Sequence, residues 1–303
     1  MPSQETLEAL GSEEFMWGLA FGFAALAIGA LAIYVWRQWR ERPVAIVSLL
    51  AAGAAVAASA VAAEPPRELW TGVALLAGAG ALYPLVSRLP LLPAALAAPG
   101  AWWVTNTVDL PGAGWVPWAL LAWIVVGGTL LADFDRHHEG TGYCPLLLVI
   151  SVAGMFATLP DTEQILVVFG AVLPLAVLSW PRGFAALGPI GVYPLLGVLA
   201  WVIAVGGQGR ESAVIGAMAA LGLLAVEPLV RWWGASTIFD VTSPRWRRFP
   251  VIALGHLAVV LLMARGAGLA ASPMRAAGIA VAIAAAAAVG LALASGARPE
   301  AAP

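Results

Sequence analysis

The sequence predicts an all-α, polytopic integral membrane protein with a bundle of about eleven transmembrane helices (ten to twelve). Of the 303 residues, 61% are hydrophobic and only 11% are charged, whereas about 25% are charged in a soluble domain. Apolar stretches of about 20 residues, the length that a helix needs to cross the hydrocarbon core, follow one another along the chain. A soluble protein could not cover its surface with so few polar groups, so lipid is the predicted solvent.

Five spans precede a polar segment that begins at Asp133, and six follow it. The expected spans are Phe15–Trp36, Pro43–Ala63, Leu69–Val86, Leu89–Val108, Trp115–Ala132, Cys144–Thr158, Gln164–Trp180, Phe184–Gly206, Ser212–Val230, Phe249–Ala264 and Met274–Ser295. Prolines within the fourth, seventh and eighth predict kinks or breaks there. The sixth has 15 residues, or about 22 Å as a helix, against a core of about 30 Å. Three explanations remain open for this short span: Gly142 and Tyr143 extend the helix, the segment is re-entrant, or the protein is thin at this point.

We expect three regions: an exposed acidic segment 1–14, a transmembrane domain 15–295 and a short cytoplasmic tail 296–303. The net charge of −2 indicates no nucleic-acid partner. The single cysteine, Cys144, excludes an internal disulfide and a multi-cysteine metal site.

The arginines predict the orientation. With the N-terminus outside and the C-terminus in the cytoplasm, eleven of the 15 arginines fall on the inner side, as the positive-inside rule requires. We therefore expect a multi-pass protein of the plasma membrane. The absence of lysine in an alanine- and glycine-rich chain is typical of a GC-rich genome, which favours a bacterial inner membrane.

Span 1 carries small residues at spacings of four and three, which form one helix face: Gly18, Gly22, Ala25, Gly29 and Ala32. Such a face lets two helix backbones approach closely in lipid. It predicts packing within the chain, a homo-oligomer or a membrane partner, in addition to contact with the bilayer.

A faint internal repeat relates the third and ninth spans at an offset of 144 residues. It aligns Gly78 with Gly222, and the Pro-Leu-Val of 84–86 with that of 228–230. Alanine- and glycine-rich helices also align by chance, so the repeat carries no further prediction.

The segment after span 5 contains the metal candidates Asp133, Asp135, His137 and His138. If the helix continues, Asp133 and His137 lie one turn apart on the same face, and two imidazoles with carboxylates suit zinc or another divalent metal. The alternative is a hydrated connector, which we favour because a closed site needs three or four converging ligands. No cofactor is otherwise predicted.

A second candidate site, for a cation or proton, lies on the outer side. It comprises Asp109, Asp161 and Glu163, together with Asn106 at the end of span 4. The structural alternative is that Asp161 caps the next helix and Glu163 favours its N-terminus.

Two ionisable residues fall within apolar spans: His256 and Glu227. Such groups are costly in lipid and indicate function by default. His256 could instead bond a backbone carbonyl, and Glu227 could pair with Arg231 one turn later.

These features favour a transporter or permease-like protein for a small or lipidic solute. The alternatives are a membrane-embedded enzyme that acts on a lipid-linked substrate at the metal candidates, or a non-catalytic assembly partner held by the face of span 1.

Overall fold

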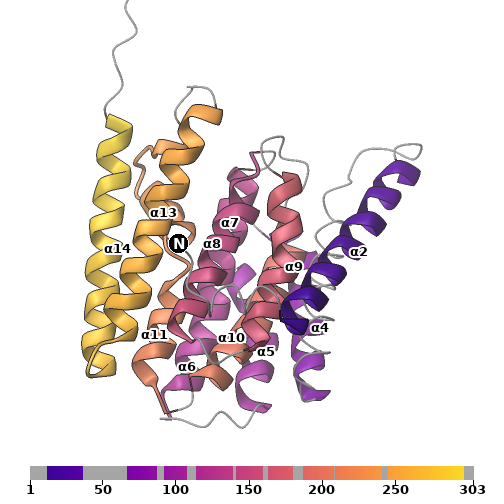
Figure 1. The fold of residues 1–303 in the computed structure, drawn as a ribbon, viewed down its shortest axis with the longest axis horizontal. Coiled ribbons are helices and arrows are strands. Elements are labelled where there is room, and N and C mark those ends of the chain that lie inside the picture. Colours follow the sequence, from indigo (N-terminus) through magenta and orange to yellow (C-terminus); the bar gives the residue numbers. More distant parts are fainter. Residues whose placement is uncertain are drawn as a thin grey trace, which may run out of the picture.

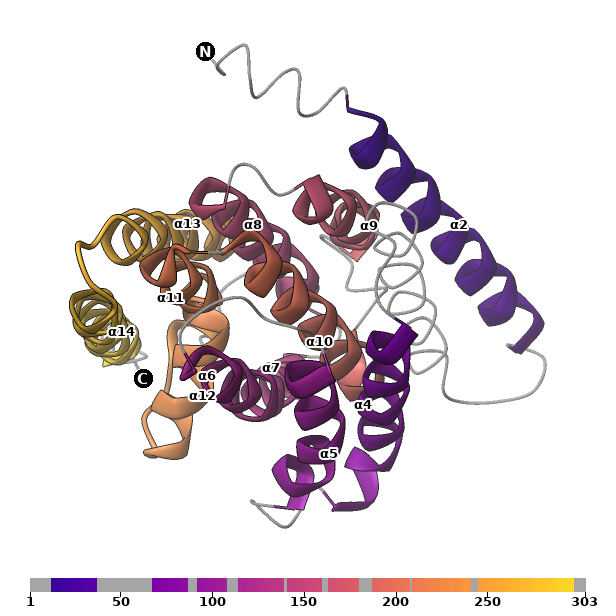
Figure 2. The same ribbon diagram turned by 90° about the horizontal axis from the view of Figure 1, so that it is seen from below.

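The chain folds into a bundle of helices that stand side by side, with α14 at one edge and α2 at the other (Figures 1 and 2). The computed structural model describes residues 12–36, 67–86, 92–107, 114–138, 141–159, 163–179, 187–207, 209–240 and 245–296, and this part of the chain contains no strand. The predicted span Pro43–Ala63 lies outside it. The helices are α2 (Glu13–Trp36), α4 (Arg67–Val86), α5 (Leu92–Thr107), α6 (Val116–Ala122), α7 (Gly128–His137), α8 (Tyr143–Thr158), α9 (Glu163–Ser179), α10 (Gly188–Gly206), α11 (Glu211–Ala219), α12 (Leu223–Trp232), α13 (Arg245–Gly268) and α14 (Pro273–Gly296).

Four helices of the described part are long and apolar enough to cross a membrane: Val116–His137, Gly188–Gly206, Phe249–Gly268 and Pro273–Ala294. The bent pair α11–α12 makes a fifth if it is one span, and α8 is a shorter apolar helix. The all-helical class is therefore confirmed, with four to five candidate spans. Such helices are compatible with a membrane location.

The helix α10 forms the centre of the bundle (Figure 2). In the most apolar stretch of α10, 78% of the residues are buried, whereas in that of α14 only 11% are buried. Its start, at Pro189 and Ile190, packs so closely on Gly80 of α4 that a Cβ there would lie 2.4 Å from a carbonyl oxygen. Small residues thus let helix backbones touch where side chains could not fit.

The small-residue face of α2 packs against α9. A Cβ at Gly18 would lie 2.3 Å from the carbonyl oxygen of Val167, and one at Gly22 would lie 2.7 Å from that of Ala171. The first half of the predicted face is therefore occupied within the chain.

Helices α7 and α12 end, and α8, α10 and α13 begin, at one end of the bundle, which we call the Asp133 end. Asp133 of α7 pairs with Arg231 of α12, and Asp135 accepts a hydrogen bond from Gly188 at the start of α10. At the opposite end the start of α6 meets that of α11, where the Trp115 indole donates to Glu211. Chain directions therefore alternate, as they do when successive spans cross a membrane.

The structure corrects the positions of the breaks. The prolines at 99, 174 and 194 lie inside α5, α9 and α10 without ending them, because neighbouring groups in a packed bundle can compensate for the lost hydrogen bond. The ninth span, expected to be one helix, instead bends by 60° between α11 and α12.

The polar segment after span 5 also differs from expectation. The helix does not end at Ala132: a π-helical turn, Trp123–Gly127, joins α6 to α7, which runs on to His137. The short sixth span gains only Tyr143, because Gly142 has a φ of 76° and stops the helix there.

Candidate functional site

A break separates α11 from α12, and the two helices are bent by 60° there. α11 ends at Ala219, and Gly222 takes a φ of +53°, in the range that favours glycine, before α12 begins. The interruption leaves backbone groups without partners in their own helix. One of them, the Met218 carbonyl, accepts a hydrogen bond of 2.8 Å from the Trp123 indole.

His256 of α13 supplies a second partner to the break. The amide of Leu223 donates to its Nδ1 at 3.2 Å, and its Nε2 lies 2.9 Å from the Leu147 carbonyl oxygen and 3.1 Å from the Ser151 hydroxyl. An amide can only donate and a carbonyl can only accept, so the imidazole is neutral with its proton on Nε2. The sequence left two roles open for His256, one functional and one structural, and these hydrogen bonds favour the structural role.

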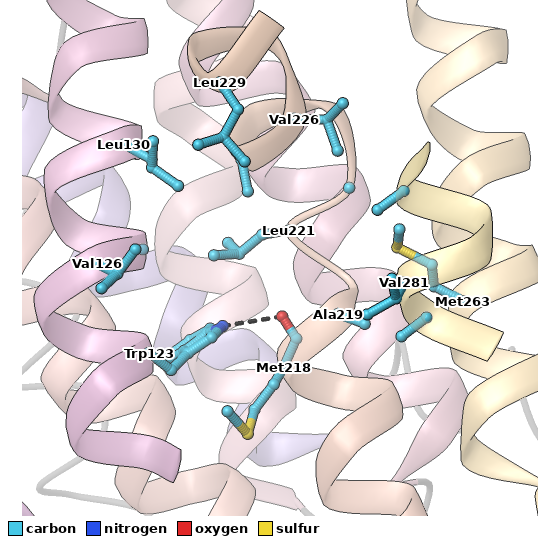
Figure 3. Close-up of a pocket in the computed structure, with 15 residues that line it drawn as sticks. Trp123, Val126, Leu130, Met218, Ala219, Leu221, Val226, Leu229, Met263 and Val281 are labelled. Atoms are coloured by element: carbon cyan, nitrogen blue, oxygen red, sulfur yellow. Dashed lines mark hydrogen bonds between the residues drawn. The ribbon is translucent and has the colours of Figure 1, made fainter. Parts of the chain in front are cut away.

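Beside the break lies an apolar groove of about 300 Å³ (Figure 3). Its walls come from the α6–α7 helix, the broken helix and the pair α13–α14. The lining residues are Trp123, Val126, Gly127, Leu130, Met218, Ala219, Leu221, Gly222, Ala225, Val226, Leu229, Met263, Ala280, Val281 and Ala284. A volume of this size is at the lower end of the range for ligand pockets.

A polar cluster lies at the Asp133 end, beyond the groove. Asp133 Oδ2 accepts from Arg231 Nη2 at 2.5 Å and from the Trp232 indole at 3.3 Å. The imidazole of His137, one turn along α7, lies 3.5 Å from Asp133 Oδ1. The expected one-turn relation of Asp133 and His137 is thus present, but their partners include a guanidinium that would repel a metal ion.

Glu227 is fully buried beside this cluster. Its Oε1 lies 3.2 Å from His138 Nε2 and accepts from the Thr237 hydroxyl at 3.3 Å. The expected pairing with Arg231 is present at 3.7 Å, whereas the contact with His138, 89 positions away in the sequence, was not predicted. Among the described residues, none donates a hydrogen bond to Glu227 Oε2, which is buried.

The four metal candidates do not converge. Asp133, Asp135 and His138 contact different groups, among them Arg231, the Gly188 amide and Glu227 respectively. Within the described residues, no three His, Cys, Asp or Glu side chains are grouped to hold a metal ion. The geometry gives the metal hypothesis no support.

The predicted outer site falls largely outside the described residues. Asp109 and Asp161 lie there, and of Glu163 only its place at the start of α9 is described. Asn106 is exposed, and its amide donates to the Trp102 carbonyl of its own helix at 3.0 Å. The outer acidic site stays a prediction.

Comparisons of this chain with protein-family models, with curated proteins and with solved structures found no match. The fold itself defines the class: an all-helical bundle whose long apolar helices are compatible with a membrane protein.

Proposed function

We propose that the chain is a multi-span membrane protein of transporter or permease-like function, and that its solute is lipidic. Its outer helices support the membrane location. Large apolar side chains stand exposed on α13 and α14, among them Leu254, Leu262, Val281 and Leu293. Soluble proteins rarely expose contiguous apolar patches of more than a few hundred Å², so a bilayer is the natural solvent for these helices.

The alternating helix directions support the orientation inferred from the arginines. The Asp133 end carries Arg136 and Arg231, together with the start of α13. We propose that this end faces the cytoplasm and that the start of α2 faces outside, in the inner membrane of a bacterium.

The observation that carries the transport proposal is the broken helix beside the groove. Transporters commonly build their binding sites from discontinuous helices near the middle of the bilayer. Here the break at Gly222 itself lines the groove. Because the wall is almost entirely apolar, the groove suits a hydrocarbon solute and offers few ligands to a hydrophilic one.

The two rival functions have less support. An enzyme at the metal candidates would need those side chains to meet, and they bind separate partners. An assembly partner on the small-residue face would compete with α9, which covers Gly18 and Gly22.

Purified protein in proteoliposomes tests the proposal. A fluorescent tail-labelled phospholipid should cross the bilayer faster than in protein-free vesicles, measured by dithionite quenching of the outer leaflet. Val126→Trp, which fills the groove, should slow this crossing, whereas Leu254→Trp on the exposed face of α13 should not. Crossing no faster than in empty vesicles would overturn a lipid solute, and equal rates for the two variants would exclude the groove as its path.

A further inference from the structure

We infer that Trp123 is a gate at the outer end of the groove, and that the path of the solute continues outward along the boundary between α6 and α11. This inference rests on the proposed function and adds to it the outer half of the path and the residue that controls passage. It follows from the place of Trp123 in the groove and from the irregular backbone on both sides of its contact.

Trp123 joins the two walls of the groove at their outer end. On the α6–α7 wall it is the groove residue nearest to the start of α6, and on the opposite wall Met218 is the one nearest to the start of α11. The indole of Trp123 donates to the Met218 carbonyl at 2.8 Å, so the walls touch there (Figure 3). Trp123 is only 9% exposed, which means that its ring is enclosed by the bundle and does not face lipid.

The boundary between α6 and α11 continues outward beyond this contact. The indole of Trp115, just before α6, donates at 3.3 Å to Glu211 Oε2 at the start of α11. Glu211 and Met218 are seven positions apart, about two turns, so they lie on one face of α11, and Ile215 lies between them on that face. From Trp115 to Trp123 the chain rises about 12 Å as a helix. We call this boundary between the two indole contacts the α6–α11 strip; with the groove, about 10 Å along the same helix, it covers most of a hydrocarbon core of about 30 Å.

The backbone is irregular on both sides of the Trp123 contact. Trp123 begins the π-helical turn Trp123–Gly127, and Met218 is the last residue but one of α11, just before the break. A shift of one residue through the π turn would rotate the indole by about 100° around the helix axis. On the other side Gly222, with its positive φ, gives the end of α11 conformational freedom. The contact therefore joins two segments that can move without the loss of a regular helix.

The lock that this contact provides depends on one indole N–H. A hydrogen bond in a membrane protein changes an equilibrium by about threefold. Trp123→Phe keeps an aromatic ring and removes the donor, so it should increase the open population of the gate about threefold. A purely structural bond predicts a different result, namely lower stability with unchanged passage.

Lipid crossing in proteoliposomes tests the gate, with Trp118→Phe as the matched control. Trp118 lies on the same helix and is 64% exposed, so its substitution removes an indole outside the contact. Trp123→Phe should raise the crossing rate of the tail-labelled phospholipid about threefold over wild type, and Trp118→Phe should leave it unchanged. A Trp123→Phe rate no higher than that of wild type, or an equal rise in both variants, would overturn the gate. If Trp123→Phe does not fold, Trp123→Leu, which also lacks the donor, takes its place with the same expectation.

Photo-crosslinking of the full chain locates the path without depending on transport. The probe is phosphatidylcholine with a diazirine at the end of one acyl chain, added to protein in bilayer nanodiscs, with labelled residues identified by mass spectrometry. The informative residues are Ile215 and, one turn after Trp115, Ala119. Their labelling should rise about threefold in Trp123→Phe relative to Trp118→Phe. Equal labelling of these residues in the two variants would overturn the outward path.

The outcomes separate this inference from the proposed function. Increased labelling of the α6–α11 strip in Trp123→Phe without lipid crossing would refute transport and leave the gate standing. Lipid crossing by the wild-type protein at a rate that Trp123→Phe does not raise would refute the gate alone. Neither crossing nor increased labelling would overturn both.

Discussion

Replacing His256 by alanine should destabilise the bundle more than any other single change at the break. The imidazole is fully buried and makes three contacts, to the Leu223 amide, the Leu147 carbonyl and the Ser151 hydroxyl. Hydrogen bonds in membrane proteins contribute about 0.6 kcal/mol each, and the imidazole can make two full bonds, one through Nδ1 and one through the single proton on Nε2, which together contribute about 1 kcal/mol. The cavity left by the ring adds about 1 to 2 kcal/mol, so we expect a loss of about 2 to 3 kcal/mol.

The assay is reversible unfolding in mixed detergent micelles, with His256→Asn and His137→Ala as matched variants. Asparagine places an amide oxygen near the position of Nδ1, so it should retain the bond from Leu223 and recover about half of the loss. The His137 side chain is 45% exposed with one carboxylate partner, and its removal should change the free energy of unfolding by less than about 0.5 kcal/mol. A His256→Ala protein within that margin of wild type would refute the reasoning that the imidazole stabilises the broken helix.

Three further predictions follow from packing, charge and orientation. Gly22→Leu should destabilise the contact of α2 with α9 by about 1 to 3 kcal/mol, which would lower the melting temperature in detergent. Gly290→Leu on α14 is the control, because a Cβ there would meet nothing within 4 Å, and it should leave the melting temperature unchanged. Equal effects of the two substitutions would contradict the packing of α2 on α9. Glu227→Leu should cost about 3 kcal/mol in the same unfolding assay, because it leaves Arg231 and His138 without the carboxylate they share; an unchanged midpoint would show that the carboxylate is not paired in solution. A reporter fused after Arg42 should be cytoplasmic and one after Gln208 external, and the reverse result would invert the proposed topology.

The positions of several helices could be predicted closely from the sequence. The expected spans Leu69–Val86 and Met274–Ser295 correspond to α4 (Arg67–Val86) and α14 (Pro273–Gly296). A long apolar run in an apolar environment must satisfy its backbone groups internally, and only a helix does so within one segment. Prolines predicted kinks or breaks in three spans, and the helices α5, α9 and α10 continue unbroken through Pro99, Pro174 and Pro194, because a packed bundle tolerates the lost hydrogen bond.

The candidate site was predictable only in its components. Asp133, His138, Glu227 and His256 stood out as charged or polar groups near or within apolar spans. Partners within one turn, such as Arg231 for Glu227, could be predicted, but partners on other helices could not. The aligned glycines Gly78 and Gly222 illustrate why: the first lies within a continuous α4, and the second has a positive φ at a break. Next to the second glycine, α13 places an imidazole that accepts a hydrogen bond from the Leu223 amide, a contact that the alignment of the two segments does not reveal.

The all-helical class, the approximate bounds of most helices and the small-residue face of α2 could be predicted from the amino-acid order, because these features depend on groups within a few turns of one another. The position of the break in the ninth span, the side chains that satisfy it, and the contacts of Asp133 with Arg231 and of Glu227 with His138 depend on how the helices pack in three dimensions. Those contacts join residues 33 to 98 positions apart. Their free energy depends on how whole helices pack, which no local pattern of residues encodes.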